Sequence, residues 1–229
     1  MTIYLTDDFG LLSGPVTLPE IPGLGAQLPS NAVQLAEPLP DPNPGHTWAL
    51  VAGEPQQLSD HRGKVYSTSN GAEHQHDALG ELPPGLTKLP RPSAAYLWSG
   101  EAWVKDCTYL HTAQTAEINR FCEANITGGF WSSALGEPHL YASQLDDQLN
   151  LTGVILRGLD SPYACRNGQG RKAFLPHTFA QLRQVGDDFT FYKLQLLQKA
   201  NQLKQSLDEA LDKRDAEAIE AVTWEDLQE

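Results

Sequence analysis

Short apolar stretches separated by prolines characterise the first half of the chain. Thirteen of the sixteen prolines lie before residue 93. Proline lacks a backbone N–H and disrupts helix interiors, so this half is predicted to consist of short strands joined by loops. The pattern places strands at 2–5, 32–35, 47–52, 64–68, 95–98 and 102–105, an extended connector at 38–45 and a tight turn at 99–101.

The spacing of apolar residues becomes helical near Asp106. Residues 108–125 contain neither proline nor glycine and carry a helical stripe. Two hairpins are predicted, 130–135 with 138–142 and 163–166 with 172–175. Between them, Ser143 or Asp146 is expected to cap a helix that runs towards Leu156. Thr178 is expected to cap a helix over 179–185, and Asp187 or Asp188 to open a longer one that ends near Asp212.

The longer C-terminal helix has apolar residues in steps of four and three. Two heptads are too few for a sustained coiled coil, so this helix is predicted to pack against its own domain. Leu194 and Leu197 lie off the stripe, which indicates burial on more than one side. The predicted fold class is α+β, with a β-rich N-terminal module of short strands followed by a mixed, helix-rich C-terminal domain. The stripe consists of Phe189, Leu196, Ala200, Leu203, Leu207 and Ala210.

Charge and cysteine usage narrow the range of partners and locations. The net charge is −13, and seven acids but no Lys or Arg precede Arg62. Such a surface repels phosphate backbones, so no nucleic-acid partner is expected. No apolar stretch approaches the roughly 20 residues that span a bilayer, and the N-terminus does not resemble a signal peptide, so no membrane partner is expected and the cytoplasm is the expected location. The three cysteines form no CxxC pair and are interpreted as reduced, packed thiols.

Four motifs follow one another in the first half of the chain: WALV at 48–51, DHRGKVY at 60–66, LGELPPGLT at 79–87 and WSGEAW at 98–103. In this order they resemble the bacteriophage tail fibre assembly family. In that family a tryptophan strand precedes an R-G-x-x-Y strand, a G-x-L-P-x-G-x-T loop and a W-x-G-x-x-W hairpin. The ordered set covers about residues 46–105.

The second half is similar to a domain of unassigned function found in phage tail proteins. The resemblance divides the chain into an extended or β segment at 1–45, a tail fibre assembly module at 46–105 and an α+β domain at 106–229. Residues 1–45 match no motif of the family, and one interpretation is that they are specific to the cognate fibre. The residues that carry the second resemblance are EIN at 117–119, YAS at 141–143, DDQLNL at 146–151, AC at 164–165, HT at 177–178 and AVTW at 221–224.

The resemblance implies a chaperone and not an enzyme. Such a protein binds the C-terminal end of a tail fibre and promotes its folding, trimerisation and assembly in the host bacterial cytoplasm, without ATP or another cofactor. The expected partner-binding residues are Tyr66, Trp98 and Trp103. An alternative is a structural component of the fibre tip that stays on the virion and contacts a host surface glycan. A third, weaker alternative is a polysaccharide-degrading enzyme, for which the sequence shows no catalytic residues.

Three groups of residues are candidates for a chemical site. His74 and His76 form an H-x-H pair that suits metals on a strand, but the surrounding composition favours an exposed polar loop and no metal site. Asp146 and Asp147 diverge by about 100° on a helix, so they are expected to act at a helix start and not as a glycosidase pair. A catalytic thiolate at Cys165 requires a partner histidine, for which His177 is a candidate, whereas a packed thiol needs none.

The tryptophans outside the partner-binding set are expected to be core residues. Trp48 shares a strand face with Leu50, which favours burial. Trp131 and Trp224 are assigned to the core of the second domain. One of Trp98 and Trp103 is expected to be exposed, because they flank a hairpin.

Overall fold

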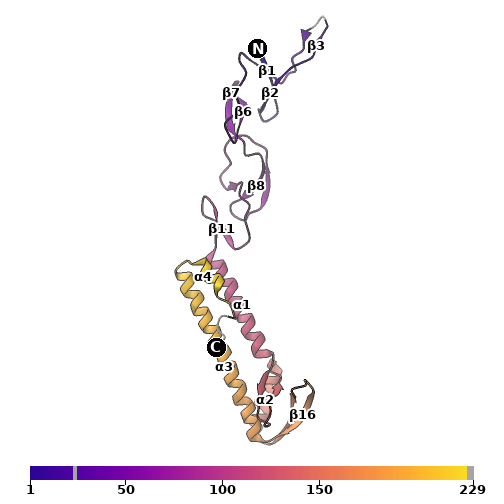
Figure 1. The fold of residues 1–229 in the computed structure, drawn as a ribbon, viewed down its shortest axis with the longest axis vertical. Helices are drawn as coiled ribbons and strands as arrows, with labels where there is room; N and C mark the ends of the chain where they lie inside the picture. Colours follow the sequence, from indigo (N-terminus) through magenta and orange to yellow (C-terminus); the bar gives the residue numbers. More distant parts are fainter. Residues whose placement is uncertain (23–24, 226–229) are drawn as a thin grey trace. The chain divides into compact units, whose positions relative to one another are not determined.

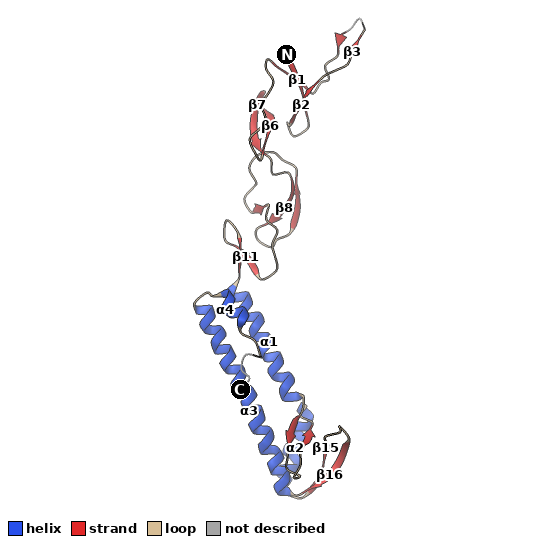
Figure 2. Ribbon diagram, in the orientation of Figure 1, coloured by secondary structure: helices blue, strands red, loops and turns tan. Residues whose placement is uncertain are grey.

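The computed structural model describes residues 1–22 and 25–225, which fall into two compact units, Met1–Val104 and Lys105–Glu229. The first consists of short antiparallel strands and the second is dominated by long helices (Figures 1 and 2). The predicted α+β class is confirmed. The finer division at residues 45 and 105 stays a prediction. None of the described helices combines the length and apolar character required to span a bilayer.

The N-terminal unit is a succession of small sheets, because its strands are too short and too polar to build one large sheet. The central strand of the first sheet is β1 and that of the third is β8. The sheets are β2(Leu12–Val16)–β1(Thr2–Thr6)–β5(Ala32–Leu35), β6(His46–Val51)–β7(Glu54–Ser59), β10(Leu86–Thr87)–β8(Gly63–Ser67)–β9(Glu73–His76), β11(Tyr96–Trp98)–β12(Trp103–Lys105) and β3(Glu20–Ile21)–β4(Gly25–Ala26).

Backbone hydrogen bonds join successive sheets of this unit. The Leu50 N–H donates to the Gly10 carbonyl at 2.8 Å, and the Gly80 N–H donates to the Ser59 carbonyl at 2.8 Å. Each sheet buries few apolar side chains, so these backbone hydrogen bonds contribute much of the stabilisation between neighbouring sheets. The buried apolar residues of the unit are Tyr4, Leu12, Ala49 and Val65.

The predicted strands are present, but several polar strands were not predicted. Strand β7 pairs with β6 across a turn in which Ala52 and Gly53 have positive φ angles of 52° and 88°. Strand β9 contains His74 and His76 and pairs with β8, so the loop predicted there is wrong. Backbone pairing with β6 and β8 holds β7 and β9 in place. Strands held in this way need no alternating apolar side chains, so the sequence pattern does not reveal them.

In the C-terminal unit, two long helices lie against each other beside a four-stranded antiparallel sheet (Figure 2). The sheet order is β13–β14–β15–β16. Ile118 and Cys122 of α1 and Leu203 and Leu207 of α3 are buried, so the stripe packs within its own domain as predicted. The elements are α1(Cys107–Thr127), β13(Phe130–Ser132), β14(His139–Tyr141), α2(Leu145–Arg157), β15(Ser161–Arg166), β16(Lys172–His177), α3(Phe179–Asp212) and α4(Ala216–Ala221).

Helix α3 is continuous, which corrects the two helices predicted on either side of Gly186. Thr178 caps it as predicted, through a capping box with Gln181. Gly186 lies where α2 approaches: a Cβ there would meet Ile155 Cδ1 at 2.6 Å. The glycine therefore permits close helix packing and does not end the helix.

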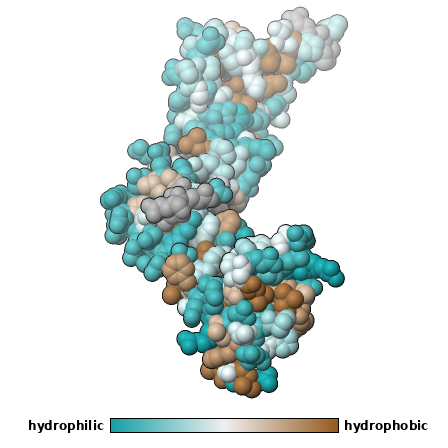
Figure 3. Space-filling model, turned by 60° about the horizontal axis from the view of Figure 1, so that its bottom comes forward, coloured by the Kyte–Doolittle hydropathy of each residue, from teal (hydrophilic) through white to brown (hydrophobic). Residues whose placement is uncertain are grey.

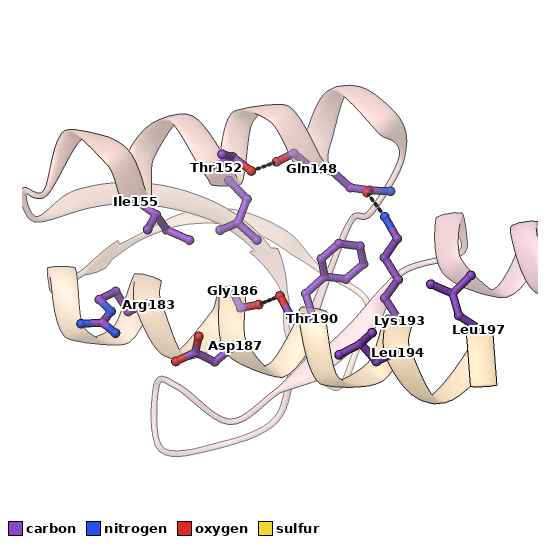
Figure 4. Close-up of a pocket in the computed structure, with 12 residues that line it drawn as sticks. Gln148, Thr152, Ile155, Arg183, Gly186, Asp187, Thr190, Lys193, Leu194 and Leu197 are labelled. Carbon is purple, nitrogen blue, oxygen red and sulfur yellow. Dashed lines mark hydrogen bonds between the residues drawn. The ribbon is translucent and has the colours of Figure 1, made fainter. Parts of the chain in front are cut away.

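A groove of about 470 Å³ runs between α2 and α3 (Figure 4). Lys193 Nζ of α3 donates to Gln148 Oε1 of α2 at 3.2 Å across it. Leu194 and Leu197 line the groove and are 50% and 45% exposed, so the predicted burial of α3 on a further side is wrong.

The N-cap of α2 differs from the prediction. It is Gln144, in a capping box with Asp147, and not Ser143 or Asp146.

Candidate partner-binding surface

The β11–β12 hairpin brings two of the three predicted partner-binding residues together. The rings of Trp98 and Trp103 meet edge to face, with centroids 5.3 Å apart and planes at 71°. Trp103 Nε1 donates to the Leu89 carbonyl at 2.9 Å, and both rings are half-buried. Edge-to-face packing and the indole hydrogen bond fix both rings, so the pair forms a preorganised aromatic surface.

Arg91 ties this hairpin to the turn between β8 and β9. Its guanidinium carbon lies 5.6 Å from the centroid of the Trp103 ring. Its Nε donates to the Tyr96 carbonyl at 2.7 Å and its Nη1 donates to the Asn70 carbonyl at 3.2 Å. The β8–β9 turn approaches so closely that a Cβ at Gly71 would lie 2.6 Å from the Arg91 Cβ. Sequence reasoning missed Arg91, because its partners are carbonyls, which any residue type supplies.

Exposed apolar side chains occur on both faces of the hairpin. Leu89, Leu97 and Val104 are 49%, 43% and 41% exposed. Side chains alternate along a strand, so Leu97 and Val104 lie on the face opposite to Trp98 and Trp103. Aromatic and arginine side chains are enriched in protein interfaces. We name Trp98, Trp103 and Leu89, whose carbonyl accepts from Trp103 Nε1, the tryptophan hairpin surface.

Tyr66 lies in the neighbouring sheet and not in the tryptophan hairpin surface. It is half-buried in the central strand β8, opposite Glu73 of β9 and Thr87 of β10. Within the described residues, the sheet and the hairpin are linked through Arg91 and not through Tyr66. The partner-binding assignment of Tyr66, Trp98 and Trp103 stays a prediction.

Arg62 of the R-G-x-x-Y motif has a local structural role. Its Nε and Nη2 donate to Asp60 Oδ1 and Oδ2 at 2.9 and 2.7 Å. The hydrogen bond from Arg62 lowers the pKa of Asp60 to about 2. Lys88 Nζ donates to the Arg62 carbonyl at 2.9 Å, which joins the start of β8 to the loop after β10. The ion pair of Asp60 and Arg62 fixes the direction in which the chain enters β8, the strand that holds Tyr66.

The histidine pair of β9 lies on one strand face, because its members are two residues apart. His74 is exposed, and His76 is half-buried with a buried Nε2 that has no hydrogen-bond partner in the structure. Among residues 1–22 and 25–225, no group of three or more His, Cys, Asp or Glu side chains is arranged to hold a metal ion.

Cys165 and His177 belong to a buried polar cluster around Tyr141. The Tyr141 hydroxyl lies 2.8 Å from His177 Nε2, and His177 Nδ1 lies 2.8 Å from the Leu175 carbonyl. A neutral imidazole that donates from Nδ1 and accepts at Nε2 satisfies both contacts. Burial lowers the pKa of His177 and raises the pKa of the Cys165 thiol. These shifts favour a neutral core cluster over a thiolate and imidazolium pair.

The remaining aromatic assignments need correction in part. Trp131 is 56% exposed on β13, so its predicted place in the core is wrong. Trp224 is half-buried and stacks on Phe121 with centroids 6.3 Å apart. Trp48 is half-buried and donates from Nε1 to the Pro40 carbonyl at 2.8 Å, while its neighbour Ala49 is the buried residue.

The chain is similar to known proteins over parts of its length. Residues 110–223 match the family model described as a domain of unknown function, DUF4376. The chain is also similar to the prophage tail fiber assembly protein homolog TfaE of Escherichia coli strain K12, with 37% identity over 68 residues that cover 28% of this chain. The match spans about a third of that relative's length, 34%. No solved structure matches the chain. The match to the DUF4376 model therefore lies within the C-terminal unit, and part of the chain is similar to a tail fibre assembly protein homologue.

Proposed function

We propose that this chain is a tail fibre assembly chaperone that binds the C-terminal end of a phage tail fibre and promotes its folding and trimerisation. The observation that carries the proposal is the partial similarity to a tail fibre assembly protein homologue. The preorganised tryptophan hairpin surface supports it, because aromatic anchors in fixed positions lose little entropy on binding.

The physical need for such a chaperone follows from fibre architecture. Intertwined fibre trimers have high contact order, so three chain ends must meet before their sheets close. During that interval, exposed strand edges and apolar ends favour aggregation. A protein that covers those ends lowers the aggregation rate while the trimer forms.

Binding energy is sufficient for this role, so the chain needs neither ATP nor a catalytic group. The proposed contacts are Trp98 and Trp103, with Tyr66 in the adjacent sheet. A polysaccharide-degrading activity is not proposed, since it needs two convergent carboxylates and Asp147, one of the two candidates, is engaged in a helix cap.

Co-expression with a tail fibre from the same phage tests the proposal. The fibre is expected to be a soluble trimer when the chain is present and largely insoluble when it is absent. A soluble, native trimer made without the chain would contradict the chaperone role. Mass spectrometry of purified virions then separates a released chaperone, absent from particles, from a component retained at the fibre tip.

A further inference from the structure

Strand β16 is an open edge of the four-stranded sheet. Among residues 1–22 and 25–225, it comes last in the sheet order and pairs only with β15 (Figure 1). Open edges present unpaired N–H and C=O groups that an extended polypeptide can match. The direction of those groups in β16 follows from the register.

The register contains a pair of prolines, Pro162 opposite Pro176. Neither proline has an N–H, so the two cannot exchange the paired hydrogen bonds of a bonded position. Residues opposite each other alternate between bonded and non-bonded pairs, so the Phe174 and Lys172 pairs are also non-bonded. The N–H and C=O of Phe174 and of Lys172 therefore point away from β15, towards the open edge.

The hairpin next to this edge is basic in an acidic protein. Residues 161–177 contain Arg166, Arg171 and Lys172 and no Asp or Glu, whereas the whole chain has a net charge of −13. No ion pair within the described part of the chain involves these three cations. The charge favours an acidic partner at this edge.

Apolar surface accompanies the basic charge. Phe174 is 71% exposed, the largest exposed aromatic fraction among the described residues. A groove of about 590 Å³ is lined by Phe174, Lys172, Leu140 and Ala164, together with polar residues that include Asp147 of α2. Figure 3 shows hydrophobic residues interspersed with polar ones on the end of the C-terminal unit that comes forward. An added strand would thus find apolar contacts beside the edge and cations next to it.

We propose that the β16 edge receives an extended, acidic segment of a partner polypeptide, which adds to the sheet at Lys172 and Phe174. Backbone pairing selects an extended chain, and the cations select acidic side chains. The natural partner that we assign to this edge is the tail fibre, and this assignment rests on the proposed function. A second copy is a poorer occupant: antiparallel self-pairing about Phe174 sets Lys172 opposite Pro176, which has no N–H, and brings two basic hairpins together.

Binding of a synthetic peptide to the full chain tests the edge. The probe is a fluorescent ten-residue peptide of alternating threonine and glutamate, which is soluble and prone to extended structure. We expect saturable binding by fluorescence anisotropy at low salt. We also expect at least tenfold weaker binding when alternate peptide nitrogens are methylated, and no binding of a threonine–lysine peptide. Equal binding of the methylated peptide would overturn strand addition, as would no saturable binding of the first peptide.

Variants locate the binding on β16. Phe174→Pro removes the outward N–H and the ring while leaving bonded pairs intact, and it is expected to weaken binding at least tenfold. Arg171→Glu combined with Lys172→Glu is expected to abolish it. Leu156→Ala, at an 81% exposed leucine of α2, is the matched control and should bind as the wild type does. Circular dichroism checks folding, and the methylated peptide and the charge reversal keep the test decisive if Phe174→Pro does not fold.

Two further outcomes distinguish strand addition by a partner from self-association at β16 and from the proposed chaperone function. Sedimentation that shows a dimer lost in Phe174→Pro would identify a second copy as the occupant and overturn the proposal. Peptide binding needs no fibre, so its failure overturns the edge site whatever co-expression shows. Conversely, a fibre that assembles without the chain contradicts the proposed function and leaves peptide binding unchanged.

Discussion

At the scale of single residues, the bidentate pair of Asp60 and Arg62 determines how the N-terminal unit responds to acid. We expect Asp60→Asn to destabilise this unit by about 1 kcal/mol at pH 7, because it weakens two charge-assisted hydrogen bonds. Urea unfolding of both proteins followed by tryptophan fluorescence measures the difference. Asp41→Asn, at an exposed acid in the same unit, is the control and should change stability little.

The pH dependence of that difference provides a second test of the Asp60 contact. The folded pKa of about 2 lies below the usual 3.8, so the stabilisation is complete above about pH 4 and declines as the pH falls towards 2. The gap between wild type and Asp60→Asn should therefore narrow from pH 5 to pH 3. A gap that stays constant over that range would show that the carboxylate is not the source of the stabilisation.

His177 gives the C-terminal unit a pH dependence at a higher range. Its folded pKa is lowered by burial, so below about pH 6.5 the unfolded chain binds a proton that the folded chain resists. Stability should fall by up to about 1.4 kcal/mol between pH 7.5 and 5.5. His177→Gln is expected to flatten this dependence in thermal melts. Tyr141→Phe keeps the buried imidazole and should retain the slope, whereas an equal slope in His177→Gln would refute the assignment.

The tryptophans show where residue-level prediction from sequence ends. The W-x-G-x-x-W spacing was enough to place Trp98 and Trp103 on the two strands of one hairpin. Alternation along a strand tells which residues share a face, but not which face is covered. Trp131 lies on the face opposite to that of buried Phe130, and its exposed fraction of 56% shows that this face is open at that position.

At the scale of elements, the start of α3 depends on its capping box. Gln181 N–H donates to Thr178 Oγ1 at 3.2 Å, and Thr178 N–H donates to Gln181 Oε1 at 2.8 Å. Thr178→Ala should destabilise the C-terminal unit by about 1 kcal/mol, and Thr178→Ser should be close to neutral. Chemical denaturation followed by circular dichroism measures both, and equal stability of the alanine and serine variants would argue against the cap.

Helix starts and glycine-centred turns were predictable, because their signals are local. Thr178 and the turns near Gly136 and Gly168 are examples. Gly186 misled the prediction, since its role depends on the approach of Ile155 from another helix. Strand β9 was missed for a related reason: its exposed polar residues carry no periodicity, and its partner β8 supplies the pairing.

At the scale of the whole molecule, the proposals assign a separate fibre contact to each of the two units. Trp98→Ala removes a half-exposed anchor of the tryptophan hairpin surface, and it is expected to reduce fibre captured on co-purification at least fivefold, as loss of an interface hot spot does. Tyr109→Ala, at a 46% exposed aromatic of α1, is the matched control and should leave capture unchanged. The free energies of contacts that act independently add, so combining Trp98→Ala with Phe174→Pro should multiply the two losses. A double variant no weaker than Trp98→Ala alone would show that the fibre contacts the hairpin surface without using the β16 edge.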